Sequence, residues 1–448
     1  MVDRQRGLKV ATGLVKKREV FYYNPDAKSA LNPHTLIVGQ SGSGKSTLLR
    51  KIIEYYYEND KTVFIIDFHG DLKTDNENLL EFTPRNSPNG INPFEIEQNK
   101  KNGGPNEQAN VIALMMGAYF MDRMSQKQKG IIEQLVKDTY ISKGIKDELP
   151  ETWTKEPPTM KDLYATCVYI ENVLNGGNAL DSSNISKANS LIEDALSKIE
   201  KAIDSSEDEN EKRVVAEIKD EISELNDKLK AYETAEGEAR NIYADLNIEN
   251  YVRVKKSLES VFAYIKDASN MSIFDDTKPK LIKGINRLDF SAFTAINKPL
   301  IAKFLAEFIA QKLFRSSMMR GEFENLENVG DIKYDRVLII DESKLALPQG
   351  REKDNPYHVM NRITTESRKY GMAVCIVSQR LEHYTKDMLS NIYTKIILKV
   401  NATDYKSVAQ TLGIDLQQVK NTFESQKGRT AIIETAGTEK LSYLIEEF

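Results

Sequence analysis

The chain has 448 residues, of which 40% are apolar and 29% are charged, and its formal net charge is −5. This length predicts two or three domains, or one domain with a large insertion, and the mildly acidic balance gives no sign of nucleic-acid binding over the whole surface. No apolar run reaches the length of a membrane-spanning helix, and no signal-peptide pattern opens the chain. The two isolated cysteines and four scattered histidines do not have the spacing of zinc ligands. We therefore expect a cytoplasmic protein with reduced thiols and no integral membrane segment.

The N-terminal residues combine a basic segment with a short apolar one. Residues 1–19 carry six Lys or Arg between Arg4 and Arg18, which favours a loosely ordered arm, with a DNA or membrane-surface contact as the alternative. The apolar and aromatic residues that follow, up to Tyr23, are typical of an edge strand.

A phosphate-binding loop is the strongest signal in the sequence. Residues 39–47 read GQSGSGKST and fit the pattern G-x-x-x-x-G-K-[ST], with an apolar strand predicted before them and a helix after them. The glycines let successive backbone N–H groups point into one concavity, and the helix dipole adds positive charge there. We expect Lys45 to reach the β- and γ-phosphates of ATP and the Ser46 hydroxyl to bind Mg²⁺. The predicted nucleotide-binding residues of the loop are Gly39, Ser41, Gly42, Ser43, Gly44, Lys45, Ser46 and Thr47.

The next apolar run, residues 62–67, is continuous, as in a strand that is covered on both faces of a sheet. It leads into the turn Phe68-His69-Gly70-Asp71. Because this turn follows the carboxyl end of a strand, we expect it to face the bound nucleotide.

From about residue 108 to 283 the pattern becomes helical. Apolar residues recur at helical spacing on two stretches, and together they predict an antiparallel helical hairpin over about 186–232. The predicted seam consists of Leu191, Ile192, Ala195, Ile199 and Ala202 on the first helix and of Ile218, Ile222, Leu225 and Leu229 on the second. The exposed faces are rich in Glu and Lys, which favours a solvated insertion over a dedicated partner-binding arm.

Alternating strands and helices return after residue 284, which predicts a mostly parallel sheet with right-handed crossovers. Residues 430–434 and 440–445 are typical of a closing hairpin. We therefore predict an α/β fold, with an ATPase core formed by residues 1–107 and 284–448 and an all-helical domain inserted at 108–283.

A second nucleotide signature is the apolar run that ends in Asp341-Glu342. Asp341 at a strand's carboxyl end can orient Mg²⁺ through its water shell, and Glu342 can take a proton from the attacking water. Because water needs an activating base, this pair favours a hydrolase over a kinase.

Three further residues are candidates for the site. Gln379 ends the strand that we expect between the two motif-bearing strands, where it can sense the γ-phosphate and hold the lytic water, although it could simply close a buried strand. Arg368 precedes that strand; it either acts on a neighbouring subunit's site or is a favourable cation at a helix end. Arg380 follows Gln379 at the edge of the sheet that we expect to face the nucleotide. It is the alternative to Arg368 as the arginine that contacts the nucleotide.

Five segments of the chain together resemble the HerA/FtsK superfamily of ring ATPases. They are the Lys45 loop, residues 67–71, Asp341-Glu342, residues 368–371 and residues 378–380. The resemblance covers about residues 30–95 and 284–448. It implies a RecA-like core that hydrolyses ATP with Mg²⁺. It also implies a homo-hexameric ring whose central pore moves DNA or serves a transport machine, with a secretion apparatus or a nuclease as a partner. The chain differs from HerA in having little sequence before the phosphate loop for an N-terminal barrel, and from FtsK in lacking membrane segments. Its helical insertion resembles that of secretion ATPases.

Three functions fit these features. The first is a motor ATPase that translocates DNA in conjugation, DNA processing or defence. The second is a type IV secretion ATPase that energises assembly or export without threading DNA itself. The third is a scaffold in which nucleotide binding sets the oligomeric state, which the catalytic types at Glu342 and Gln379 argue against.

Overall fold

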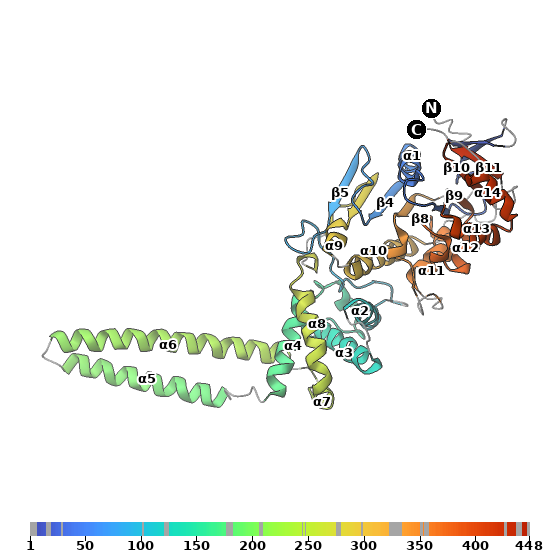
Figure 1. Cartoon of the computed structure of the whole chain (residues 1–448). Helices are drawn as coiled ribbons and strands as arrows, with labels where there is room; N and C mark the ends of the chain where they lie inside the picture. Colours follow the sequence, from blue (N-terminus) through green and yellow to red (C-terminus); the bar gives the residue numbers. More distant parts are fainter. Residues whose placement is uncertain are drawn as a thin grey trace. The chain divides into compact units, whose positions relative to one another are not determined.

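The structure is a computed structural model (Figure 1). The residues it describes are 7–14, 19–27, 30–100, 103–120, 125–175, 182–205, 209–243, 245–246, 248–274, 279–296, 299–321, 334–349, 353, 358–424, 428–435 and 441–445.

Two compact units divide the chain. The first comprises residues 1–91 and 271–448, and the second comprises residues 92–270. The first unit thus contains both outer segments of the sequence, and the second is inserted between them. Both observed boundaries precede the predicted ones at 107/108 and 283/284. The reason is local: the Asn92 amide donates to Pro158 O within the helical unit, whereas Ile91 N donates to Ile273 O within the first unit.

The first unit is built on one mixed sheet. Its strand order is β2-β1-β11-β10-β9-β3-β8-β7-β4-β6-β5. The strands are β1 Leu8–Gly13, β2 Val20–Tyr23, β3 Thr35–Val38, β4 Thr62–Asp67, β5 Glu77–Glu81, β6 Ile285–Asp289, β7 Arg336–Ile340, β8 Met372–Ser378, β9 Thr394–Leu398, β10 Thr430–Thr435 and β11 Leu441–Ile445.

Strands from β9 to β5 in this order are parallel, and β10, β11, β1 and β2 extend the sheet with antiparallel pairs. The predicted α/β class with a mostly parallel sheet is therefore confirmed. β8 lies between β3 and β7, so the strands that end in the phosphate loop, in Gln379 and in Asp341 are direct neighbours. Because all three are parallel, their carboxyl ends meet at one edge of the sheet.

The central strands are buried on both faces. Every residue of β3 and β8 is buried, as expected for apolar strands covered by helices on either side. Helix α1, Lys45–Glu58, packs on one face, where Leu49, Ile52 and Ile53 join a core cluster with Ile65 and Ile339. The other helices of this unit are α9 Ser291–Ala295, α10 Pro299–Met319, α11 Val359–Glu366, α12 Lys386–Asn391, α13 Tyr405–Leu412 and α14 Leu416–Glu424.

Two features of the first unit differ from the sequence-based prediction. Residues 8–13 form β1, paired with β2 and β11, where we expected a loosely ordered basic arm. Val10 and Ala11 are fully buried there, and this apolar burial outweighs the basic composition of the segment. The short edge strand β5 was not predicted, because Glu and Asn interrupt its apolar residues.

The α-helices of the second unit form its core, and its described residues contain no strand. The helices are α2 Pro105–Phe120, α3 Gln126–Ser142, α4 Met160–Leu174, α5 Ser182–Ser205, α6 Glu209–Ile242, α7 Glu249–Val252 and α8 Lys255–Ser269. The core contains Leu135 from α3, Leu163 and Cys167 from α4, and Ile265 from α8.

Helices α5 and α6 form an antiparallel pair, with ion pairs of 2.8 Å between Lys219 and Glu200 and of 2.7 Å between Lys230 and Glu193. The predicted seam is partly wrong. Leu191 is 70% exposed and Leu225 is 61% exposed, and Ile218 is also on the outside. The half-buried residues of α5 instead recur at spacings of four, three and four, at Ile192, Leu196, Ile199 and Ile203, which gives the contact a heptad-like seam. Ala202 and Leu229 lie outside the described side chains.

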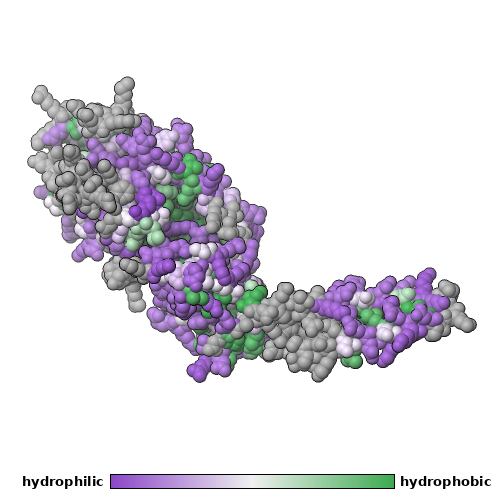
Figure 2. All heavy atoms as spheres, turned by 180° about the vertical axis from the view of Figure 1, so that it is seen from behind, coloured by the Kyte–Doolittle hydropathy of each residue, from purple (hydrophilic) through white to green (hydrophobic). Residues whose placement is uncertain are grey.

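Hydrophobic residues consequently interrupt the hydrophilic surface of this hairpin, which is seen at the right of Figure 2. Among the helices within the described ranges, none is both long enough and apolar enough to cross a membrane.

Candidate functional site

The loop after β3 has the backbone that its glycines predict. Gly42 has φ 78° and Gly44 has φ 97°, values that residues with a side chain rarely adopt. The loop is anchored by Gly39 N, which donates to Ser378 O, and by Gln40 N, which donates to Lys399 O. Helix α1 begins directly after Gly44, so its free N–H groups open into the loop's concavity.

A cleft of about 370 Å³ lies over this loop at the carboxyl edge of the sheet. Its walls are completed by the turn after β4, by residues that follow β7 and β8, and by the segment before β10. The lining residues are Ser41, Gly42, Gly44, Lys45, Ser46, Thr47, His69, Asp71, Asp341, Glu342, Gln379 and Arg429.

Lys45 extends back over the beginning of the loop. Its Nζ donates to Gly39 O at 2.7 Å and to Gln40 O at 3.1 Å. Since an ammonium group has three protons, it can bind one further acceptor, such as a phosphate oxygen, without losing either contact. Partial burial lowers the pKa of Lys45, and the nearby Glu342 and Asp341 carboxylates oppose that shift.

Asp341 and Glu342 follow β7 but have different surroundings. Asp341 is 7% exposed, and burial raises the pKa of its carboxyl to about 6, with the charges of Asp71 and Asp67 acting in the same direction. Glu342 has φ 47°, a left-handed conformation that is uncommon for a residue with a side chain. Its Oε1 accepts a hydrogen bond from Gln379 Nε2 at 2.8 Å, so the two residues expected to handle water are in contact.

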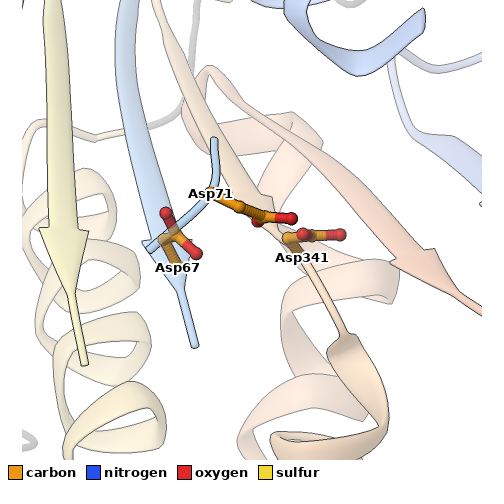
Figure 3. Close-up of side chains that lie close together, drawn as sticks. All are labelled: Asp67, Asp71 and Asp341. Atoms are coloured by element: carbon orange, nitrogen blue, oxygen red, sulfur yellow. The ribbon is translucent and has the colours of Figure 1, made fainter. Parts of the chain in front are cut away.

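Three carboxylates come together beside the loop. Ligand atoms of Asp67, Asp71 and Asp341 all lie within 4.8 Å of one another, and Figure 3 shows the carboxylates of Asp71 and Asp341 side by side. Carboxylate oxygens together with a serine hydroxyl are the ligands that Mg²⁺ prefers, and Ser46 lines the same cleft. These residues therefore fit a magnesium ion bound with a nucleotide's phosphates.

Asp67 is already engaged in organising the turn that carries Asp71. Its carboxylate accepts hydrogen bonds from the backbone N–H groups of His69, Gly70 and Leu72, and its Oδ2 lies 3.1 Å from Nη1 of Arg287. Asp71 and Asp341 are consequently the two members of the cluster best placed to bind a ligand.

Most of the predicted site residues line the cleft, and four do not. Gly39 lies at the base of the loop, where a Cβ would come within 2.5 Å of Ser43 Oγ, and Ser43 is buried beneath the loop. Arg380 pairs with Asp404, with Nε 3.2 Å from Oδ1. Arg368 donates to Leu31 O, just before β3, so it lies at the edge of the sheet opposite to the cleft of its own chain.

Three lining residues were not among the predicted ones. His69 and Asp71 lie in the turn that was expected to face the nucleotide, and the position of that turn after β4 was the signal that could have identified them. Arg429 is far from every motif in the sequence. It reaches the loop only because β10 pairs with β9, and a single sequence contains no sign of that approach.

Comparisons with known proteins identify the family of this chain and several relatives. A model of the family described as the central domain of the helicase HerA matches residues 13–309. The DNA double-strand break repair helicase HerA of Pyrococcus furiosus is 28% identical over 37% of this chain and 33% of its own. A probable helicase of Methanocaldococcus jannaschii is 21% identical over 91% of this chain and 65% of its own. The chain thus spans about one third to two thirds of the length of these relatives.

A solved structure extends the similarity to the whole fold. The structure of VirB4 of Thermoanaerobacter pseudethanolicus matches with a TM-score of 0.66 at 13% sequence identity, and the match covers 100% of this chain and 98% of that one. At this identity the match concerns the fold, including the helical insertion.

Proposed function

Because the chain belongs to the family of the HerA helicase central domain, we propose that it is a motor ATPase that hydrolyses ATP with Mg²⁺ and translocates DNA. The observation that carries this proposal is the cleft itself, where Lys45, Asp341 and Glu342 converge from separate segments of the sequence. In the proposed mechanism the loop amides and Lys45 hold the phosphates. Ser46, Asp341 and Asp71 would hold the metal ion, whose charge would offset that of the phosphates.

The chain's own residues then act on water. Glu342 takes a proton from the attacking water, and Gln379 orients that water and the Glu342 carboxylate together. The hydrogen bond between them fixes the direction of the base, which would otherwise be free to rotate at this exposed edge.

The proposed working unit is a homo-hexameric ring in the cytoplasm, with Arg368 completing the site of a neighbouring subunit. Within its own chain Arg368 lies away from the cleft, which fits a role between subunits. Both cysteines are buried and unpaired, as expected in a reducing compartment.

A second candidate is a type IV secretion ATPase that drives assembly or export without threading DNA. The observation that favours it is the fold-level match to VirB4, which covers the helical unit as well as the sheet. In this case the ring would act with partner proteins of a secretion machine.

One experiment separates the two candidates. ATP hydrolysis is measured with purified wild-type protein, alone and with double-stranded DNA, and Lys45→Ala serves as the control for contaminating activity. The DNA-motor proposal predicts turnover that rises severalfold with DNA. Turnover that is measurable but indifferent to DNA would favour the secretion ATPase, and the absence of Lys45-dependent turnover under both conditions would contradict both.

A further inference from the structure

Arg429 is the one cationic residue of the cleft that comes from the C-terminal hairpin. It lies directly before β10, and its carbonyl accepts a hydrogen bond from Ile445 N at 2.8 Å. The preceding Gly428 has φ 105°, a conformation that leads the chain sharply into the strand. Because β10 pairs with β9 and β9 pairs with β3, the sheet itself holds the Arg429 backbone beside the phosphate loop.

The side chain packs directly over the loop. A Cβ built on Gly44 would lie 3.1 Å from Cδ, 3.4 Å from Nε and 3.5 Å from Nη1 of Arg429. A side chain at Gly44 would therefore push against this arginine, and the positive φ of Gly44 disfavours one as well. The guanidinium thus lies beside Gly44, the residue that directly precedes α1.

The Arg429 guanidinium adds positive charge to a cleft that holds both cations and carboxylates. Among the described residues, no carboxylate or carbonyl is paired with the Arg429 guanidinium, whereas Arg380 is paired with Asp404 and Arg287 with three carboxylates. The loop amides, the positive end of α1 and Lys45 lie on the same side of the cleft. A ligand with several anionic oxygens would accept hydrogen bonds from the guanidinium and pair with its charge.

We propose that Arg429 binds the α- and β-phosphate oxygens of the nucleotide, as a subsite that the C-terminal hairpin contributes in the same subunit. This rests on the proposed function, since it takes the cleft to be a nucleotide site. The assignment to these phosphates follows from the position at Gly44: the loop amides cradle the α- and β-phosphates, whereas Lys45 reaches the β- and γ-phosphates and Glu342 and Gln379 belong at the γ end.

The effect on nucleotide affinity and on kcat distinguishes this role from that of a catalytic arginine. The α- and β-phosphates are present in both ATP and ADP, so the contact stabilises both complexes alike. A contact of equal strength in substrate and transition state raises KM when it is lost and leaves kcat unchanged. Arg429 also lies beyond residues 13–309, the segment that the family model matches.

The test measures the dissociation constants of ADP and of a non-hydrolysable ATP analogue, with Mg²⁺, for wild type, Arg429→Ala and Arg429→Lys. Loss of charged hydrogen bonds should weaken both nucleotides about 10–100-fold in Arg429→Ala. Arg429→Lys should fall between, because it keeps the charge and loses the forked donors. KM for ATP should rise by a similar factor in Arg429→Ala, with kcat within about twofold of wild type.

Lys420→Ala is the matched control, since Lys420 is an exposed cation on α14, which precedes β10. It removes the same charge from the same part of the chain and should leave both affinities unchanged. Unchanged affinities in Arg429→Ala would overturn the proposal, and so would a loss confined to the ATP analogue, which would place the contact at the γ-phosphate. Should Arg429→Ala fail to fold, Arg429→Lys decides in the same way. If wild type binds neither nucleotide, it is the proposed function that fails.

Discussion

The carboxyl group of Asp341 shows how a functional residue can cost stability. Its pKa in the folded chain is raised to about 6, mainly by burial, whereas an exposed aspartate titrates near 3.9. The folded state therefore holds this proton more tightly than the unfolded state does, so the group lowers stability as the pH rises from about 4 to about 6, and its full cost is present above pH 6.

We expect Asp341→Asn to increase the free energy of unfolding of the nucleotide-free protein at pH 7.5, by up to roughly 2–3 kcal/mol. The gain should shrink as the pH falls below about 6, where the wild-type carboxyl of the folded chain takes up its proton, and it should be small near pH 4. Urea unfolding followed by circular dichroism at pH 7.5 and pH 5 measures it, and stabilisation by Mg²⁺ with nucleotide should be lost in the same variant. A destabilisation of equal size at both pH values would show that burial does not strain this carboxylate.

Arg287 joins neighbouring strands of the sheet through buried ion pairs. It lies on β6 with a nearly fully buried side chain, and its guanidinium is within 3.1 Å of carboxylate oxygens of Asp67 on β4, Glu77 on β5 and Asp289 on β6. One cation thus ties three neighbouring strands together, and through Asp67 it supports the turn that carries Asp71. Removing it leaves carboxylates without a partner in a water-poor environment.

Arg287→Met should therefore cost about 3–5 kcal/mol of folding free energy, as expected when one partner of a buried ion pair is removed. Arg287→Lys should cost less, because the charge remains. Arg320→Ala is the control: its pair with Asp335 is partly exposed, and such pairs contribute about 1 kcal/mol or less. Equal small losses in urea unfolding for Arg287→Met and Arg320→Ala would show that the buried network does not hold these strands.

Elements with a strong local pattern were predicted well from the sequence. The phosphate loop and the strand ending in Asp341 follow from apolar runs and a motif, because local chemistry fixes each of them. The failures share one cause, which is long-range pairing. β1 forms because β11 and β2 are beside it, Arg429 reaches the loop through β10, and the seam of the α5–α6 pair depends on which faces meet.

At the scale of the whole molecule, Arg368 tests whether the active unit is a ring. An arginine supplied by a neighbouring subunit is typically worth roughly 10³–10⁵ in rate, because it stabilises charge on the transferred phosphoryl group. Arg368→Ala subunits keep the Lys45 loop, and Lys45→Ala subunits keep the arginine. Mixing the two inactive variants should restore part of the ATPase activity, since some interfaces then combine an intact loop with an intact arginine.

The control for this experiment is the oligomeric state of each variant, measured by light scattering before mixing. A mixture that remains inactive although both variants assemble into the same ring would exclude Arg368 from a role between subunits. Full activity of Arg368→Ala alone would pass that role to another cation, with Arg380 next in order because it follows Gln379 at the carboxyl end of β8.

The central claim is that the cleft of Lys45, Asp341 and Glu342 hydrolyses ATP with Glu342 as the base, and single-turnover hydrolysis by Glu342→Gln tests it most directly. The isosteric amide keeps the size of the side chain and its place beside Gln379 while removing the proton acceptor. The account predicts that nucleotide binding is retained and that the hydrolysis rate falls about 10²–10⁴-fold. A single-turnover rate close to that of wild type would contradict it.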